Sequence, residues 1–307
     1  HTGRLDNGRG AFNEVQFFLL GGGECLVDDL FVAQTGAANR VSNGNFESGL
    51  DGWVIQGNHI RSELSEPGEG FQSERSLYLR ATSGGDNGAN RIESDLTSSL
   101  SNGQRATLRA KVRWLRGHSE ILIRVHGNPI ELSGRLSVPL NLGSPGEANS
   151  QARVNSGPAI VGVSHDPILP RTGQSVEVRA QVSDPDGLSN LVLKYRTDRQ
   201  DEYRSAPMTY RGAGSYTANI PGQSNRTIVA FYVEATDAHS VSVSSQFPEN
   251  PFNRECLVRF GESTINSDFG TYRLWIADDN VNTWRRRVKL SNELIDSTFV
   301  YGNFRAI

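Results

Sequence analysis

The residues of this chain that are best suited to binding chemistry lie on one alternating stretch in its first half. Between residues 106 and 115 apolar and polar side chains alternate, so Arg109, Lys111 and Arg113 share one face of an expected strand. A row of cations suits an acidic polysaccharide. Cross-strand ion pairs with Glu93 and Asp95 offer a simpler explanation of the same row. Both readings place it on the solvated face of an antiparallel sheet.

A saccharide site also needs aromatic rings that stack on sugar faces, beside polar groups that bind hydroxyls. Trp114 falls on the apolar side of the alternating stretch, and Trp53 follows a turn into a core strand. We therefore assign both tryptophans to the core. Tyr78 and Phe71 remain as candidate ligand-binding aromatics. No residue pattern indicates a catalytic group, so no catalytic residue is assigned.

The composition predicts the elements that must position these residues. The 307 residues include 32 glycines, and short alternating stretches separated by turn formers recur along the chain, which favours an all-β fold of tandem antiparallel sandwiches. A net charge of -3 gives no reason to expect nucleic acid as a partner. No apolar run reaches the length of a membrane span. The two cysteines, Cys25 and Cys256, are expected to be buried free thiols, with a disulfide as the alternative.

Both ends of the chain read as incomplete β-elements. Residues 12–20 and 24–32 predict two strands joined by three glycines, and two strands alone cannot bury a core. Near the other end, residues 281–287 form the best short helix candidate, preceded at 278–280 by good N-cap residue types. Strands with unsatisfied edges are templates for pairing with another chain. We therefore expect other copies of the chain, or the rest of a longer polypeptide, as partners.

Two short segments resemble a known module. NGNFESGLDGW at residues 43–53 resembles the opening of jelly rolls with a galactose-binding-like, carbohydrate-binding type of fold, and LVDDL at residues 26–30 is similar to the closing strand of the same family. The resemblance implies that residues 1–36 are the closing strands of a preceding jelly roll. It implies that residues 42–146 are the next, complete one.

The second half of the chain suggests two further modules. Turn signals spaced along residues 153–262 indicate an immunoglobulin- or fibronectin-like sandwich. FGTYR at residues 269–273 and LSNELIDSTFVYGN at residues 290–303 resemble the entry to a kinase domain of the spore-coat-protein-H (CotH) type. Residues 263–307 would then be an incomplete entry to that domain. The catalytic residues of such a kinase would lie beyond Ile307.

The jelly-roll resemblance also implies a structural calcium ion. By motif, Glu47 matches the acid of the opening strand, and Asp28 and Asp29 match the acid pair of the closing strand. Calcium prefers several hard oxygen ligands, which carboxylates supply. The resemblance assigns the aspartates and Glu47 to two different modules, however, and no other cofactor is expected.

These observations support three hypotheses about function. The first is a non-catalytic structural or adhesive segment of an extracellular or cell-surface bacterial protein, assembling into a filament or matrix by β-strand exchange. The second is a glycan-binding module, which predicts a groove on the sandwich of residues 42–146. The third is the upstream region of a CotH-like kinase.

Overall fold

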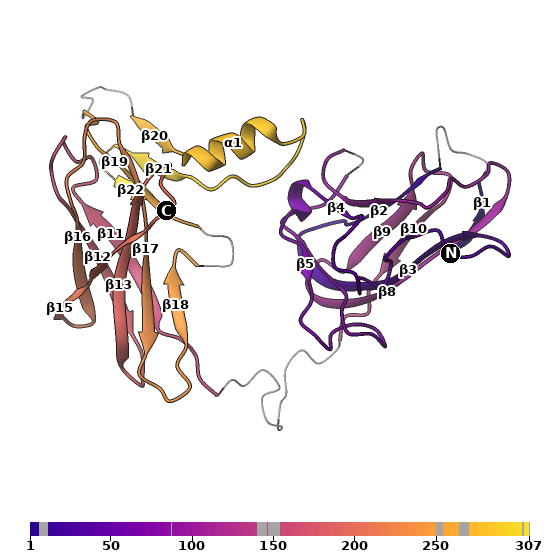
Figure 1. The fold of residues 1–307 in the computed structure, drawn as a ribbon, viewed down its shortest axis with the longest axis horizontal. Coiled ribbons are helices and arrows are strands. Elements are labelled where there is room, and N and C mark those ends of the chain that lie inside the picture. The colour runs from indigo at the N-terminus through magenta and orange to yellow at the C-terminus, as the bar shows by residue number, and fades with distance from the viewer. Residues whose placement is uncertain are drawn as a thin grey trace. The chain divides into compact units, whose positions relative to one another are not determined.

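The computed structural model describes residues 1–5, 12–86, 88–139, 146, 154–249, 254–263, 270–302 and 304–306. The chain divides into two compact units, which are described separately (Figure 1). Unit 1 comprises His1–Leu142 and Arg287–Leu294, and unit 2 comprises Gly143–Arg286 and Ile295–Ile307. Strands dominate both units, which confirms the all-β class. The described residues include no helix with the length and apolar character that a membrane span requires.

Unit 1 is a sandwich of two five-stranded antiparallel sheets. Sheet I has the order β1-β8-β3-β6-β5, and sheet II has the order β10-β9-β2-β7-β4. The strands of sheet I are β1 (Thr2–Arg4), β8 (Arg105–Gly117), β3 (Gly23–Gln34), β6 (Leu77–Ala81) and β5 (Glu63–Leu64). The strands of sheet II are β10 (Glu131–Arg135), β9 (Glu120–Val125), β2 (Glu14–Leu19), β7 (Ile92–Asp95) and β4 (Val54–Ile55).

The core of unit 1 is built where the two sheets face each other. Phe17 and Phe46 are both fully buried, and Trp53 is 8% exposed. The Trp53 ring meets Phe17 edge-on with centroids 5.6 Å apart and stacks on Phe46 at 5.2 Å. Aromatic pairs in these arrangements stabilise a core beyond the area that they bury. The expectation that Trp53 belongs to the core is confirmed.

The N-terminal strands differ from the expectation that they close a preceding module. β2 lies between β9 and β7, and β3 lies between β8 and β6, so both are paired on both edges. Their apolar side chains, including Phe17 and Leu19, belong to the same core as those of residues 42–142. The physical reason is that β3 is the central strand of sheet I and β2 is the central strand of sheet II, so neither sheet is continuous without them. The boundary expected between residues 36 and 42 is corrected, because the two segments form one sandwich.

Unit 2 is a second sandwich with a small sheet packed on it. One sheet has the order β11-β12-β16-β15 and the other has the order β14-β13-β17-β18, with β19 also paired to β17. Their bounds are β11 (Ala159–Asp166), β12 (Val176–Ser183), β16 (Ser215–Ile220), β15 (Thr209–Gly212), β14 (Arg204–Pro207), β13 (Leu188–Thr197), β17 (Ile228–Asp237), β18 (Ser244–Phe247) and β19 (Cys256–Arg259). Apolar residues of both sheets form one buried cluster.

The C-terminal part of unit 2 forms a separate three-stranded sheet and a helix. The strands are β20 (Tyr272–Trp275), β21 (Thr298–Tyr301) and β22 (Phe304–Ala306), and the helix is α1 (Asp278–Arg286). One face of the sheet buries Trp275 and Val300 against Leu257 of β19 and nearby apolar residues. α1 confirms the expected helix and its start. The segment 269–273, which carries part of the kinase resemblance, begins outside the described residues.

Both cysteines are buried and neither forms a disulfide, as expected. Burial raises the pKa of the Cys25 thiol to about 12, so the reactive thiolate is scarce at neutral pH.

Candidate functional site

The outer face of sheet I carries the expected row of cations. Along β8 Ala106, Leu108, Ala110 and Val112 belong to or pack against the core, while Arg109, Lys111 and Arg113 are exposed, which confirms the predicted alternation over this part of the strand. Trp114 is half-buried and is not part of the core cluster. Opposite Arg109 in the register, Phe31 of β3 lies on the same face. The Arg109 guanidinium stacks over the Phe31 ring, 4.1 Å from its centroid. Tyr78 of β6 shares this face.

A β-bulge in β3 sets the shape of this face. The register of β3 against β8 shifts between Asp28 and Phe31, and Asp29 lies at the bulge with a φ of 49°. Aspartate tolerates this left-handed conformation better than most residues, and bulges redirect side chains. As a result Asp29 is exposed, while the neighbouring Asp28, opposite Lys111 in the register, is buried by the loop that carries Phe71 and Ser73. The structure gives Asp29 no ion pair and no side-chain hydrogen bond among the described residues.

The loop at residues 43–45 closes over the bulge. The Leu30 N–H donates a hydrogen bond of 2.9 Å to the Gly44 carbonyl. A Cβ on Gly44 would lie 2.5 Å from the Leu30 carbonyl oxygen, so this approach requires glycine. The Asn39 amide holds the other side, donating to the Leu30 carbonyl at 2.9 Å and accepting from the Val41 N–H at 3.1 Å.

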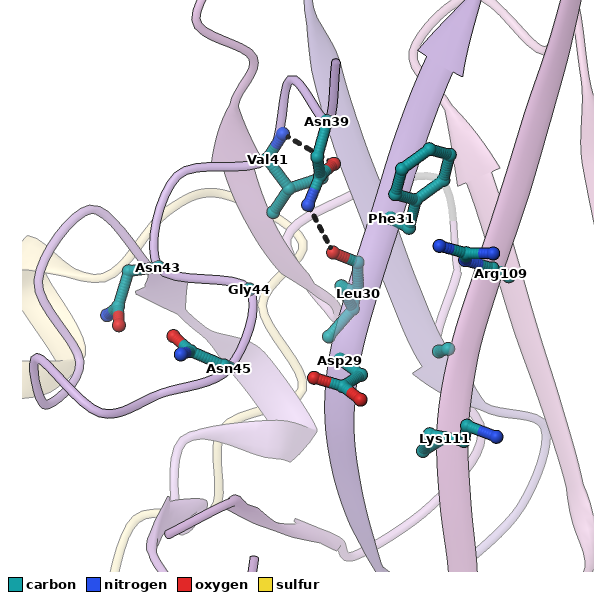
Figure 2. Close-up of a pocket in the computed structure, with 11 residues that line it drawn as sticks. Asp29, Leu30, Phe31, Asn39, Val41, Asn43, Gly44, Asn45, Arg109 and Lys111 are labelled. Carbon is teal, nitrogen blue, oxygen red and sulfur yellow. Dashed lines mark hydrogen bonds between the residues drawn. The ribbon is translucent and has the colours of Figure 1, made fainter. Parts of the chain in front are cut away.

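This loop, β3 and β8 line a cavity of about 590 Å³, which we call the Asp29 groove. Figure 2 shows Asn45 of the loop facing Asp29 of β3, with Arg109 and Lys111 on neighbouring β8. It is lined by Asp29, Leu30, Phe31, Asn39, Val41, Asn43, Gly44, Asn45, Arg109, Ala110 and Lys111. The groove thus combines a carboxylate, an amide, two cations and an aromatic side chain. This is the set of groups that binds polyhydroxylated ligands.

The polar residues of the groove divide into structural and available groups. The Asn39 amide is already hydrogen-bonded to backbone groups of Leu30 and Val41. Asn43 is also structural, because its amide donates to the Gly49 carbonyl at 2.9 Å and accepts from the Ser48 N–H at 3.0 Å. Asn45 is exposed and has no side-chain hydrogen bond among the described residues. The available oxygen and nitrogen atoms therefore belong to Asp29, Asn45 and the two cations.

A smaller cavity of about 210 Å³ adjoins the groove, and we call it the Phe71 cavity. It is lined by Leu26, Asp28, Glu69, Gly70, Phe71, Ser76, Lys111, Val112 and Arg113. Phe71 is 41% exposed, and the Lys111 ammonium lies 4.4 Å from its ring centroid. The row therefore borders both cavities, and Lys111 is common to the two.

The sequence-based candidates do not all belong to these cavities. Tyr78 lies elsewhere on the face, where its hydroxyl donates to Glu24 at 2.5 Å and Arg80 covers its ring at 4.1 Å. Burial, and then the hydrogen bond to Glu24, raise the pKa of Tyr78. The suggested neutralisation of the row by Glu93 and Asp95 does not occur, because both acids lie on β7 in sheet II. Arg113 instead lies 3.8 Å from Glu69.

The first of the carboxylates that the resemblance assigned to calcium acts as a hydrogen-bond acceptor. Asp28 is 2% exposed, and its Oδ1 accepts the Asp29 N–H at 2.7 Å. Its Oδ2 accepts the Phe71 N–H at 2.7 Å and the Ser73 hydroxyl at 2.9 Å. These bonds anchor the loop that carries Phe71 to β3, and they satisfy the buried carboxylate.

Glu47 anchors the same loop from another direction. Its Oε1 accepts the Arg75 N–H at 2.7 Å. Asp28, Asp29 and Glu47 thus belong to one unit, which corrects the assignment to two modules. Within the described part of the chain, however, no group of three or more histidine, cysteine, aspartate or glutamate side chains converges in a way that could hold a metal ion.

Unit 2 has a cavity of its own, of about 620 Å³, whose wall contains a polar network. Arg196 pairs with Glu255 through two bonds, Nε to Oε1 at 2.8 Å and Nη2 to Oε2 at 2.7 Å. The Tyr203 hydroxyl donates to the same Glu255 carboxylate. The hydrogen bond with Glu255 raises the pKa of Arg196, and burial together with Glu255 raises that of Tyr203 to about 12. These charges neutralise one another, and we read the network as structural.

The alternation pattern identifies Arg109, Lys111 and Arg113 as outward residues of the site. It does not identify Phe31 or Asn45. The Asn-Gly-Asn sequence at residues 43–45 marks a turn, but only its docking on β3 makes Asn45 part of the groove. Phe31 falls after the bulge, so a regular alternation along β3 assigns it to the wrong face.

Comparison with known proteins adds little to this geometry. No family model and no curated protein matches the chain. Among solved structures, the chain is similar to a DUF4785 family protein from Legionella pneumophila, with 6% sequence identity and a TM-score of 0.28 over 91% of this chain and 68% of that chain. A likeness of this TM-score supports no argument about function.

Proposed function

We propose that the chain is a non-catalytic, adhesive segment of an extracellular bacterial protein, and that unit 1 binds a saccharide. The Asp29 groove is the observation that carries the proposal. Asp29 and Asn45 offer an acceptor and an amide that no other described residue uses, and they face each other in a cavity of about 590 Å³. Hydroxyl groups of a sugar donate to a carboxylate and exchange hydrogen bonds with an amide.

The backbone at Asp29 supports a binding role. A non-glycine residue with positive φ is uncommon, and such residues occur frequently at binding sites. Here the conformation exposes a carboxylate whose neighbour, Asp28, is buried and bonded to the Phe71 loop. The rigid bulge and the bonded loop at residues 43–45 position the groove before any ligand arrives, which lowers the entropic cost of binding.

The module types support the extracellular setting. The segment at residues 43–53 resembles the opening of carbohydrate-binding-type jelly rolls. In unit 2 the order β11-β12-β16-β15 corresponds to strands A-B-E-D of immunoglobulin-type sandwiches, an architecture common in cell-surface domains.

A glycan array probed with the full chain tests the proposal. We expect binding in the wild type and a loss of about tenfold or more in Asp29→Asn, because a hydrogen bond to a charged group contributes about 1.5–3 kcal/mol. Asparagine tolerates the left-handed conformation, so this variant should fold. Asp51→Asn is the matched control, since Asp51 is exposed in the same unit and lies outside the groove. An array on which the wild type binds nothing would refute the proposal.

Self-association is a second candidate function, supported by an apolar face at the C-terminal sheet of unit 2. Tyr272, Leu274, Phe299 and Tyr301 are 65%, 56%, 40% and 47% exposed and lie on adjacent strands. The N-terminal half of the strand-exchange argument is lost, because β2 and β3 are already paired on both edges. Light scattering over a range of concentrations tests the remainder, and a monomer at every concentration would contradict it.

A further inference from the structure

Two of the cations on the outer face of sheet I are not neutralised. Arg109 and Lys111 contact aromatic rings, and neither has an ion pair among the residues that the structure describes. Three other cations of this face have acidic partners. Those pairs are Arg80 with Glu63 at 2.9 Å, Arg113 with Glu69 at 3.8 Å, and Arg116 with Glu24. Arg4 of β1 and Arg105 at the start of β8 also have no ion pair among the described residues, but they line neither cavity. Arg109 and Lys111 are therefore the cations without an ion pair that line the two cavities.

These two positions are suited to holding one anionic group. Outward side chains two residues apart on a strand are about 7 Å apart at Cα, and both side chains are long enough to converge on a group between them. Stacking on Phe31 and Phe71 limits the freedom of both cations, so less entropy is lost on binding. A guanidinium also matches the geometry of a carboxylate or sulfate.

The carboxylates around the cavities decide where an anion can bind. Asp28 lies across from Lys111 in the register, but its oxygens are already bonded to two N–H groups and a hydroxyl. Asp29 is free and would repel an anion while accepting hydroxyl groups. A ligand that suits the whole groove therefore carries hydroxyls toward Asp29 and Asn45 and a negative charge toward β8.

We infer that the saccharide bound by unit 1 is an anionic oligosaccharide, whose carboxylate or sulfate is held by Arg109 and Lys111. The inference rests on the proposed function. Because Lys111 lines both the Asp29 groove and the Phe71 cavity, the site spans more than one sugar unit. One sugar occupies the groove, and its neighbour extends over Phe71.

Titration calorimetry with the full chain and matched probes tests the inference. The probes are a short oligogalacturonate, its methyl ester of equal length, and a sulfated galactan oligosaccharide. We expect the oligogalacturonate or the sulfated probe to bind, the methyl ester to bind at least about tenfold more weakly, and affinity for the acid to fall as salt is raised. The two acidic arms distinguish a carboxylate ligand from a sulfate ligand.

Variants on one strand supply the controls. Arg109→Gln and Lys111→Gln should each weaken binding of the acidic probe about tenfold or more, and Lys111→Arg should retain most of it. Arg116→Gln is the matched control, because Arg116 shares the strand, is paired with Glu24 and lines neither cavity, so its loss should change affinity less than about threefold. Unchanged melting temperatures would show that these exposed substitutions leave the fold intact.

The outcomes separate the inference from the proposed function. If the methyl ester binds as tightly as the acid and Asp29→Asn abolishes both, saccharide binding stands and the anionic specificity is refuted. If Arg116→Gln weakens binding as much as Lys111→Gln, the assignment of the charge to Arg109 and Lys111 is refuted. If neither the array nor any probe shows binding, the proposed function is refuted and the inference with it.

Discussion

His59 makes the stability of unit 1 depend on pH in a way that the structure specifies. It lies in the 3-10 helix η1 (Gly57–His59) and is fully buried. Its Nε2 accepts the Leu19 N–H at 3.2 Å, so Nδ1 carries the proton and donates to Asn58 Oδ1 at 2.6 Å. Protonation of Nε2 would place a second donor against the Leu19 N–H. Burial lowers the pKa of His59 to about 4, although the charge of Asp86 opposes part of this shift.

The sign and size of the effect follow from this shift. A histidine whose folded pKa is depressed stabilises the fold in its neutral form, so its contribution is present above the unfolded pKa of about 6.5 and is lost as the pH falls toward 4. With folded and unfolded values of about 4 and about 6.5, His59 alone lowers the free energy of unfolding by about 2 kcal/mol between pH 7 and pH 5.

Denaturant unfolding of the wild type and of His59→Gln at both pH values isolates this contribution. Glutamine keeps a polar side chain without a titrating proton, so the free energy of unfolding of unit 1 in the variant should fall about 2 kcal/mol less between pH 7 and pH 5. Hydrogen exchange at the Leu19 amide reports on unit 1 in the full chain. Equal pH dependence in both proteins, or an imidazole that titrates near 6.5 by NMR, would refute the reasoning.

Three further predictions concern the framework of the site. Gly44→Ala should lower the free energy of unfolding by about 2 kcal/mol, because its Cβ would lie 2.5 Å from the Leu30 carbonyl; calorimetry showing no loss would contradict this. Cys25 and Cys256 should not react with a thiol reagent in the native protein, and two thiols should react after denaturation; fast native labelling would show that one is accessible. Because the Asp28 oxygens are already bonded, the melting temperature should be equal in calcium and in EGTA, and a rise with calcium would contradict this.

The fold class and the row of cations could be predicted from the sequence because both depend on local alternation. Residues 106–115 have a period of two, and the same pattern decides which side chains of β8 are buried. The helix at Asp278 could be predicted for a similar reason, since its N-cap residue types and first turn are adjacent in the chain.

The groove itself depends on contacts between distant residues. The bulge at Asp29 is visible only in the register of β3 against β8, and the docking of Gly44 depends on a backbone hydrogen bond to Leu30. A regular strand would turn Asp29 toward the core, on the side of Cys25 and Val27. The sequence pattern cannot show that shift. The jelly-roll resemblance assigned both aspartates to one calcium site, whereas the structure gives them different roles.

The position of the module boundary could not be predicted either, because the order of segments along the chain differs from their order in the sheets. Residues 26–30 resemble the closing strand of a jelly roll and residues 43–53 resemble its opening, yet the closing-type segment comes first in the chain. The pairing of strands, not their order in the chain, defines a sheet, and β3 lies between β8 and β6 although both follow it in the sequence. Because both segments lie in one sandwich, Asp29 from the first and Asn45 from the second meet across a single groove. The binding site that we propose therefore exists only because the turn at residues 43–45 docks on β3 within the same sandwich.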